Sequence, residues 1–189
     1  MECPICESKK IEQTITFFEK SVSSDSQLID SKIHNVICED CGNVFNKNGS
    51  RDDVTNFYTN DYQLHTTSPN SEFVYFVDEK NINYSSFRFE ILKKVINFKK
   101  TGKILDIGCG KGNFLFEFSK RMPDWKIFGV EASKVAIDVA RKKIPYARFH
   151  QGLFKPGVFD EKFDIIVILG VIEHLEHPVE FLKWVKVQN

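Results

Sequence analysis

Residues 105–114 have the sequence Leu-Asp-Ile-Gly-Cys-Gly-Lys-Gly-Asn-Phe, which is typical of a turn between a buried strand and a helix. The apolar run at 103–108 predicts a short buried strand, and the residues from Asn113 to Arg121 predict a helix. Three glycines between them let a ligand approach the backbone at the carboxyl end of the strand. Because Asn113 stands where a dinucleotide fingerprint has its third glycine, the Gly-x-Gly-x-x-Gly pattern fails.

The same alternation of strand and helix continues on both sides of this unit. A βαβαβ order implies a parallel sheet with helices on both faces, which is an α/β fold. Strands are predicted at 103–108, 126–131, 147–150 and 163–169, and helices at 85–99, 113–121, 134–143 and from Pro178 to about Lys186.

Two acidic residues narrow the choice of ligand. Asp106 stands at the glycine turn, where it would repel a pyrophosphate but could accept a hydrogen bond from an ammonium group. Glu131 closes the next strand, 21 residues after Gly110, where it could accept hydrogen bonds from both hydroxyls of a ribose. A ligand with a ribose and an amine but no phosphate at the turn fits S-adenosylmethionine.

The chain resembles the class I S-adenosylmethionine-dependent methyltransferases over roughly residues 84–187, through the segments 105–114, 129–133 and 163–183. The resemblance implies a Rossmann-like partial class I core with strand order 3-2-1-4. It also implies cofactor-binding roles for Arg88 before the first strand, Asp106, Gly108, Cys109 and Gly110 at the turn, Glu131 and Ala132 at the end of the second strand, and Gln151 and Gly152 after the third. Leu169, Gly170 and Val171 would form the floor near the transferred methyl group.

The sequence does not assign a catalytic residue as clearly as it assigns the cofactor-binding residues. His174 is a candidate general base, and the alternative is that it packs under the following helix. Tyr58, Tyr62 and His65 could contact an acceptor, or they could pack the connecting segment.

Four of the five cysteines form two Cys-x-x-Cys pairs with 31 residues between them. Two such turns supply the four soft ligands of a tetrahedral Zn²⁺ site, and four thiolates leave no open position, so the zinc would be structural. Disulfides or unrelated thiols are the alternative. The predicted ligands are Cys3, Cys6, Cys38 and Cys41.

We expect three regions: a zinc-ribbon-like module at 1–48, an aromatic-rich connecting region at 49–83, and a partial class I domain at 84–189. The module looks like that of bacterial sugar and polysaccharide methyltransferases. A complete class I domain has seven strands, and strands five to seven are absent. We therefore expect either a fragment of a longer protein or a second copy of the chain that covers the exposed fourth strand.

Composition and charge constrain the remaining function classes. The 26 basic and 26 acidic residues cancel, but residues 1–82 carry seven basic against fourteen acidic residues and residues 83–189 carry nineteen against twelve. The acidic charge of the N-terminal module argues against nucleic-acid binding by that module. The basic charge of residues 83–189 favours an anionic acceptor. No apolar stretch has the length of a membrane span and no secretory signal is present, so a cytoplasmic location is expected.

The sequence is compatible with three functions. The first is a methyltransferase acting on a small-molecule or carbohydrate acceptor such as a nucleotide sugar. The second is an RNA or protein methyltransferase that uses the zinc module for recognition. The third is a non-catalytic cofactor-binding or scaffold protein.

Overall fold

The computed structural model describes residues 1–17, 20–22, 28–29, 33–47, 57–58, 74–77 and 80–188. Its largest sheet has four parallel strands in the order β10-β9-β8-β11, which confirms the predicted order 3-2-1-4. The strands are β8 (Gly102–Ile107), β9 (Trp125–Glu131), β10 (Arg148–Gln151) and β11 (Ile165–Ile168).

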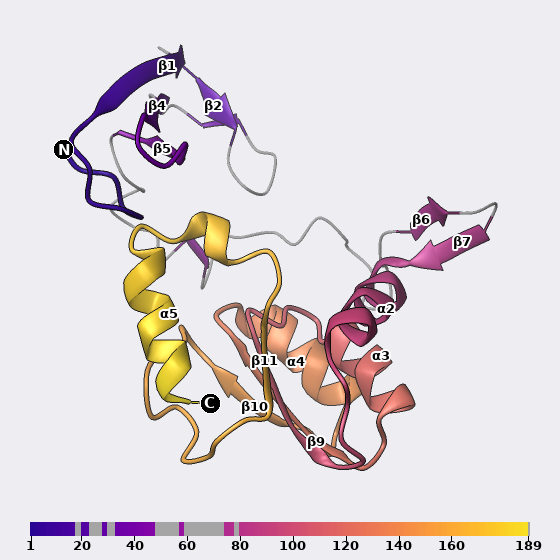
Figure 1. Cartoon of the computed structure of the whole chain (residues 1–189). Helices are drawn as coiled ribbons and strands as arrows, with labels where there is room; N and C mark the ends of the chain where they lie inside the picture. The colour runs from indigo at the N-terminus through magenta and orange to yellow at the C-terminus, as the bar shows by residue number, and fades with distance from the viewer. Residues whose placement is uncertain are drawn as a thin grey trace.

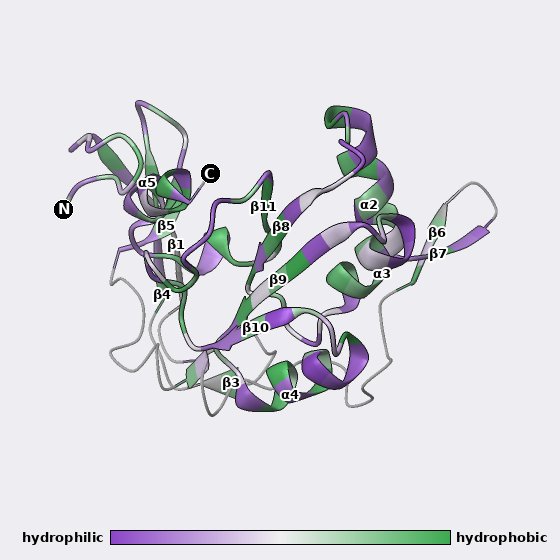
Figure 2. Ribbon diagram, turned by 90° about the horizontal axis from the view of Figure 1, so that it is seen from below, coloured by the Kyte–Doolittle hydropathy of each residue, from purple (hydrophilic) through white to green (hydrophobic). Residues whose placement is uncertain are grey.

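The helices cover both faces of this sheet, as Figure 1 shows with α5 on the opposite side from α2 and α3. They are α2 (Tyr84–Val95), α3 (Asn113–Arg121), α4 (Lys134–Lys143), the 3-10 turn η2 (Ile172–His174) and α5 (Pro178–Val187). Figure 2 shows the two-sided character of α4, whose hydrophobic residues alternate with hydrophilic ones along the helix.

Side chains alternate between the two sheet faces along β8 and divide the core in two. Ile104 packs with the aromatic residues Phe89, Phe118 and Trp125 on the face of α2 and α3. Leu105 belongs to the second cluster, which includes Phe181 of α5. Burial on both faces explains why these strands are almost continuously apolar.

The N-terminal residues form a separate small antiparallel sheet in the order β1-β4-β5. Its strands are β1 (Ile11–Phe17), β4 (Ile33–Cys38) and β5 (Val44–Asn46). Two short hairpins complete the described elements: β2 (Ser21–Val22) pairs with β3 (Leu28–Ile29), and β6 (Val74–Val77) pairs with β7 (Lys80–Asn83).

Several boundaries differ from those predicted. Helix α2 ends at Val95 instead of Lys99, because Ile96 is extended (φ −122°, ψ 129°) and the chain turns so that Phe98 stacks on Phe89 at 5.6 Å. The connecting region at 49–83 contains the hairpin of β6 and β7, which was not predicted.

None of the helices within the described ranges is both long enough and apolar enough to cross a membrane.

Candidate functional site

The glycine turn joins β8 to α3 at the carboxyl end of the sheet. Gly108 and Gly110 have φ values of 77° and 52°, in the left-handed region that favours glycine. A Cβ added at Gly110 would have no neighbour within 4 Å, so space is open above its backbone. A Cβ added at Gly108 would lie 2.2 Å from Cγ2 of Val171, because the loop after β11 covers that glycine.

Glu131 ends β9 directly beside the turn, as predicted. Its two carboxylate oxygens each accept a backbone hydrogen bond at 2.8 Å, one from Gly110 and one from Ser133. Burial raises its pKa, and these N–H groups and that of Ala132 oppose the change. The carboxylate is therefore held in one orientation with acceptor capacity left for a ligand hydroxyl.

Asp106 lies in β8, opposite Gly129 of β9 and Val167 of β11. Its side chain is buried, with 2% of the residue exposed, and Oδ1 has no hydrogen-bond partner among the described residues. Burial raises its pKa from 3.8 to about 7; the charge of Arg88 opposes this shift and that of Glu131 adds to it. An unpartnered buried carboxylate oxygen is costly and indicates a place for a ligand donor.

Arg88 comes from α2, before the first strand. Its guanidinium lies 3.7 Å from the centre of the Tyr84 ring and donates to the Tyr84 hydroxyl at 2.6 Å. Its charge acts on Asp106 and opposes the rise in the pKa of that carboxyl group. Tyr84 thus holds the Arg88 guanidinium in a position from which its charge acts on Asp106.

The predicted adenine-side residues lie together at the ends of β9 and β10. Gln151 is the last residue of β10 and not the first residue after it, because the strand pairs with β9 as far as Glu131. Gly152 donates its backbone N–H to the carbonyl of Glu131 at 2.8 Å, and the Gln151 amide lies 3.5 Å from the carbonyl of Ala132. Cys109 is buried in the turn, and burial raises the pKa of its thiol.

The loop after β11 brings the remaining predicted residues to the same end of the sheet. Leu169 and Gly170 precede Val171, which the sequence placed near the transferred methyl group and whose side chain lies over Gly108. His174 donates its backbone N–H to Val171, and its ring lies 5.9 Å from that of Tyr58 in the connecting region. Of the other acceptor candidates, Tyr62 and His65 lie outside the described residues.

The four N-terminal cysteines converge, and no disulfide joins them. Their sulfurs all lie within 4.8 Å of one another, and the pairs Cys3–Cys41 and Cys6–Cys38 are 3.6 Å apart. Four ligands at about 2.3 Å from a tetrahedral zinc would be about 3.8 Å apart. The sulfur positions therefore fit such an ion.

The two Cys-x-x-Cys turns have the same backbone pattern. The first cysteine of each bonds its N–H to the carbonyl five residues later, and its carbonyl accepts from the N–H four residues later. The fourth residue after that cysteine has positive φ in both turns: 61° at Glu7 and 73° at Gly42. Two matching turns that face one set of sulfurs are the geometry a four-thiolate site requires.

Comparison with known proteins finds methyltransferases that are similar to the C-terminal part of the chain. Residues 105–187 match the family model described as "Methyltransferase domain". An uncharacterised methyltransferase of Schizosaccharomyces pombe is 35% identical over 100 residues, covering 47% of this chain and 36% of the relative. A tRNA U34 carboxymethyltransferase of Campylobacter jejuni is 32% identical over 107 residues, covering 54% and 36%.

Among solved structures, the plantazolicin methyltransferase BpumL in complex with SAH (S-adenosylhomocysteine) is 31% identical. The match covers 46% of this chain and 34% of that chain, with a TM-score of 0.42. The chain thus spans about a third of the length of these relatives. Residues 105–187 are thus similar in sequence to a methyltransferase domain, and the parallel sheet with its glycine turn has the fold of the class I methyltransferase core.

Proposed function

We propose that the protein transfers a methyl group from S-adenosylmethionine to a small-molecule or carbohydrate acceptor. The observation that carries the proposal is the buried Oδ1 of Asp106, which lacks a partner among the described residues beside an open glycine turn. The ammonium group of the cofactor would supply the missing donor, with a charge of the right sign.

The other residues around the turn suit the rest of the cofactor. Arg88 would pair with its carboxylate, and Glu131, already oriented by two N–H donors, would accept from the ribose hydroxyls. We assign the methionine part to Gly108, Cys109 and Gly110, the adenine to Ala132, Gln151 and Gly152, and the floor near the methyl group to Leu169 and Gly170.

The bound cofactor supplies a methyl group activated by a sulfonium. The protein's contribution is to hold the acceptor about 3 Å from that group and to exclude water, which accounts for most of the rate. A base is needed only where the acceptor must lose a proton. His174 is the candidate base, and its contact with Tyr58 also fits a packing role.

We propose that the N-terminal module binds one structural Zn²⁺ through its four cysteines and that the regions 1–48, 49–83 and 84–189 are the functional divisions of the chain. The matching backbone of the two turns supports the metal site. A module this small buries little apolar surface, so the ion would supply much of its stability.

The acceptor is proposed from charge. The methyltransferase half carries nineteen basic and twelve acidic residues, which favours an anionic acceptor such as a nucleotide sugar. An RNA acceptor is the second candidate, because one relative is named for a tRNA. The five basic and eight acidic residues at 1–50 speak against RNA contact through the module.

A second copy of the chain is a further proposed partner. Strand β11 is at the edge of the four-stranded sheet, and an apolar edge strand is a template for pairing. Sedimentation at increasing concentration should then show dimers or larger species, and a monomer at high concentration would exclude this partner.

Calorimetric titration with SAH tests the central proposal. We expect one site per chain, and Asp106→Ala and Glu131→Ala should each weaken binding at least tenfold. Binding that survives both substitutions would refute the site, and the absence of binding to the folded wild-type protein would favour a scaffold role. Methylation assays with nucleotide sugars and with tRNA would then separate the two acceptor classes.

A further inference from the structure

Helix α2 carries three pairs of residues one turn apart, and each pair has a different environment. Ser85 and Phe89 are buried, each with 4% of the residue exposed, and Phe89 belongs to the core beneath the helix. Successive residues of an α-helix are about 100° apart. The pair Tyr84/Arg88 therefore lies on one flank of the buried pair, and Ser86/Glu90 lies on the other.

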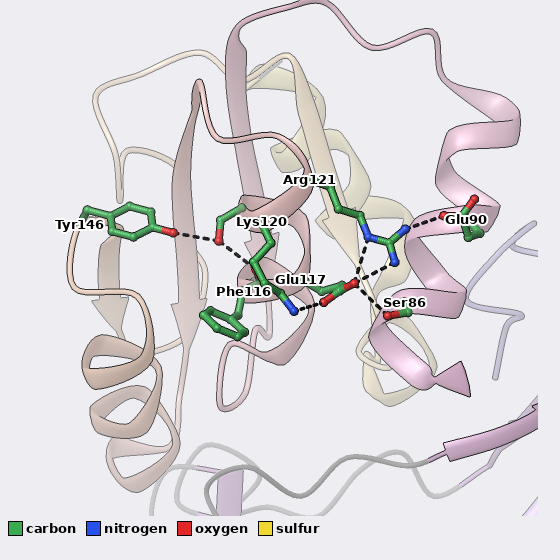
Figure 3. Close-up of polar contacts among 8 residues, drawn as sticks. Ser86, Glu90, Phe116, Glu117, Lys120, Arg121 and Tyr146 are labelled. Atoms are coloured by element: carbon green, nitrogen blue, oxygen red, sulfur yellow. Dashed lines mark hydrogen bonds and ion pairs between the residues drawn. The ribbon is translucent and has the colours of Figure 1, made fainter. Parts of the chain in front are cut away.

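The flank of Ser86 and Glu90 faces α3, where Glu117 collects the contacts shown in Figure 3. Oε1 of Glu117 accepts a hydrogen bond from the Ser86 hydroxyl at 2.9 Å and another from Nε of Arg121 at 2.9 Å. Arg121 in turn contacts Glu90, and Lys120 lies 2.5 Å from Oε2 of Glu117. Two points on α2, one turn apart, are thus tied to one acidic residue of α3.

The Glu117 side chain is only 14% exposed, so its contacts are partly shielded from solvent. Burial acts to raise its pKa, but donors from Lys120, Ser86 and Arg121 outweigh this effect, and its pKa is lowered. The carboxylate therefore stays ionised and fully engaged across the neutral pH range.

The opposite flank of α2 carries Tyr84 and Arg88. Arg88 is held against the Tyr84 ring there, and its charge acts on Asp106. The buried pair and the contacts on the α3 flank together hold α2 in one rotation about its axis. A change of that rotation would move the Arg88 guanidinium relative to Asp106.

We propose that Glu117 is a positioning residue for the cofactor site, acting through the rotation of α2 on Arg88. The inference rests on the proposed function, since it assigns Arg88 to the carboxylate of the bound cofactor. Glu117 itself touches no part of that site: its partners are Ser86, Lys120 and Arg121.

A double-mutant cycle read out by SAH affinity tests this role. We expect Glu117→Gln to raise the Kd for SAH about 3- to 10-fold, because the amide keeps the side-chain shape but loses the ion pairs. In an Arg88→Ala background the same substitution should change the Kd less than twofold. Ser86→Ala should act in the same direction as Glu117→Gln.

Asp138→Asn is the matched control, because Asp138 makes similar ion pairs with Lys134 and Arg141 on α4 and none with α2. It should leave the SAH affinity unchanged. Thermal unfolding of each variant shows how much stability is lost, and that loss should be equal with and without Arg88. An equal loss of affinity in both backgrounds, or no loss in either, would overturn the positioning role alone. Failure of the wild-type protein to bind SAH would overturn the proposed function together with this inference.

Discussion

The buried carboxyl group of Asp106 should make the protein less stable as the pH rises, and Asp106→Asn should remove this effect. In the folded protein burial raises the pKa of Asp106 from 3.8 to about 7. Below about pH 3.8 the group is protonated in both the folded and the unfolded state, so its ionisation does not change the free energy of unfolding. Between 3.8 and 7 the unfolded chain ionises while the folded one does not, so stability falls, and above 7 the cost is constant.

The size of the effect follows from the shift. About three pKa units at 1.36 kcal/mol each give a cost of about 4 kcal/mol above pH 7, to the accuracy of an order-of-magnitude figure. The residue is 2% exposed, so solvent screening does not reduce it. An asparagine amide at this site has its own burial cost of about 1–3 kcal/mol, but that cost does not depend on pH.

Urea unfolding at pH 4.5 and pH 8, followed by the fluorescence of the buried Trp125, measures the difference. The stability of Asp106→Asn relative to the wild-type protein should rise by about 3 kcal/mol between the two pH values. Asp138→Asn is the control with the opposite sign, because hydrogen bonding to Lys134 lowers the pKa of Asp138. A relative stability of Asp106→Asn that does not change with pH would refute the reasoning.

The remaining predictions concern the cofactor, the cysteine turns and the acceptor side. SAH binding at pH 6 should release close to one proton per chain, because Asp106 ionises when the ligand ammonium group binds beside it; at pH 8 fewer protons should be released. Calorimetric titrations in two buffers of different ionisation enthalpy would measure the number of protons released. No proton release at pH 6 would contradict the assignment of Asp106. Glu7→Gly should raise the free energy of unfolding of the zinc-loaded module by up to about 1 kcal/mol, because glycine adopts the left-handed backbone conformation at position 7 without strain. Gly42→Ala should lower the same free energy by about 1 kcal/mol, because alanine is strained in that conformation. A chelator should remove one zinc per chain and unfold residues 1–47, as seen by amide exchange, and Cys38→Ser should mimic it; an unchanged module after metal removal would exclude a structural ion. His174→Gln should cut kcat at least 100-fold if the imidazole is the base, and less than tenfold if it packs against Tyr58.

The elements of the sheet could be predicted from the sequence because strands buried on both faces are short apolar runs. Asn113–Arg121 and Lys134–Lys143 matched the predicted helices. The end of α2 could not be predicted, since Ile96 and Phe98 continue the helical spacing of apolar residues while contacting the core from an extended chain. The hairpin of β6 and β7 was missed because its strands are only four residues long.

The residues of the site could be predicted from the sequence, but their contacts and hydrogen-bond partners could not. The spacing of Gly110 and Glu131 anticipates a pair that the structure joins by a 2.8 Å hydrogen bond. Nothing local marks Val171 as the residue over Gly108, because that contact joins segments 63 residues apart in the chain. The missing partner of Asp106 is likewise a property of the packed sheet, which no single segment encodes.

The cysteine cluster also has an electrostatic consequence. A zinc ion held by four thiolates carries two net negative charges, and the backbone N–H groups near the sulfurs spread this charge without cancelling it. Residues 1–50 already hold five basic and eight acidic residues. Metal loading would therefore make the N-terminal region more anionic, repelling a polyphosphate chain and attracting the basic residues of the methyltransferase half.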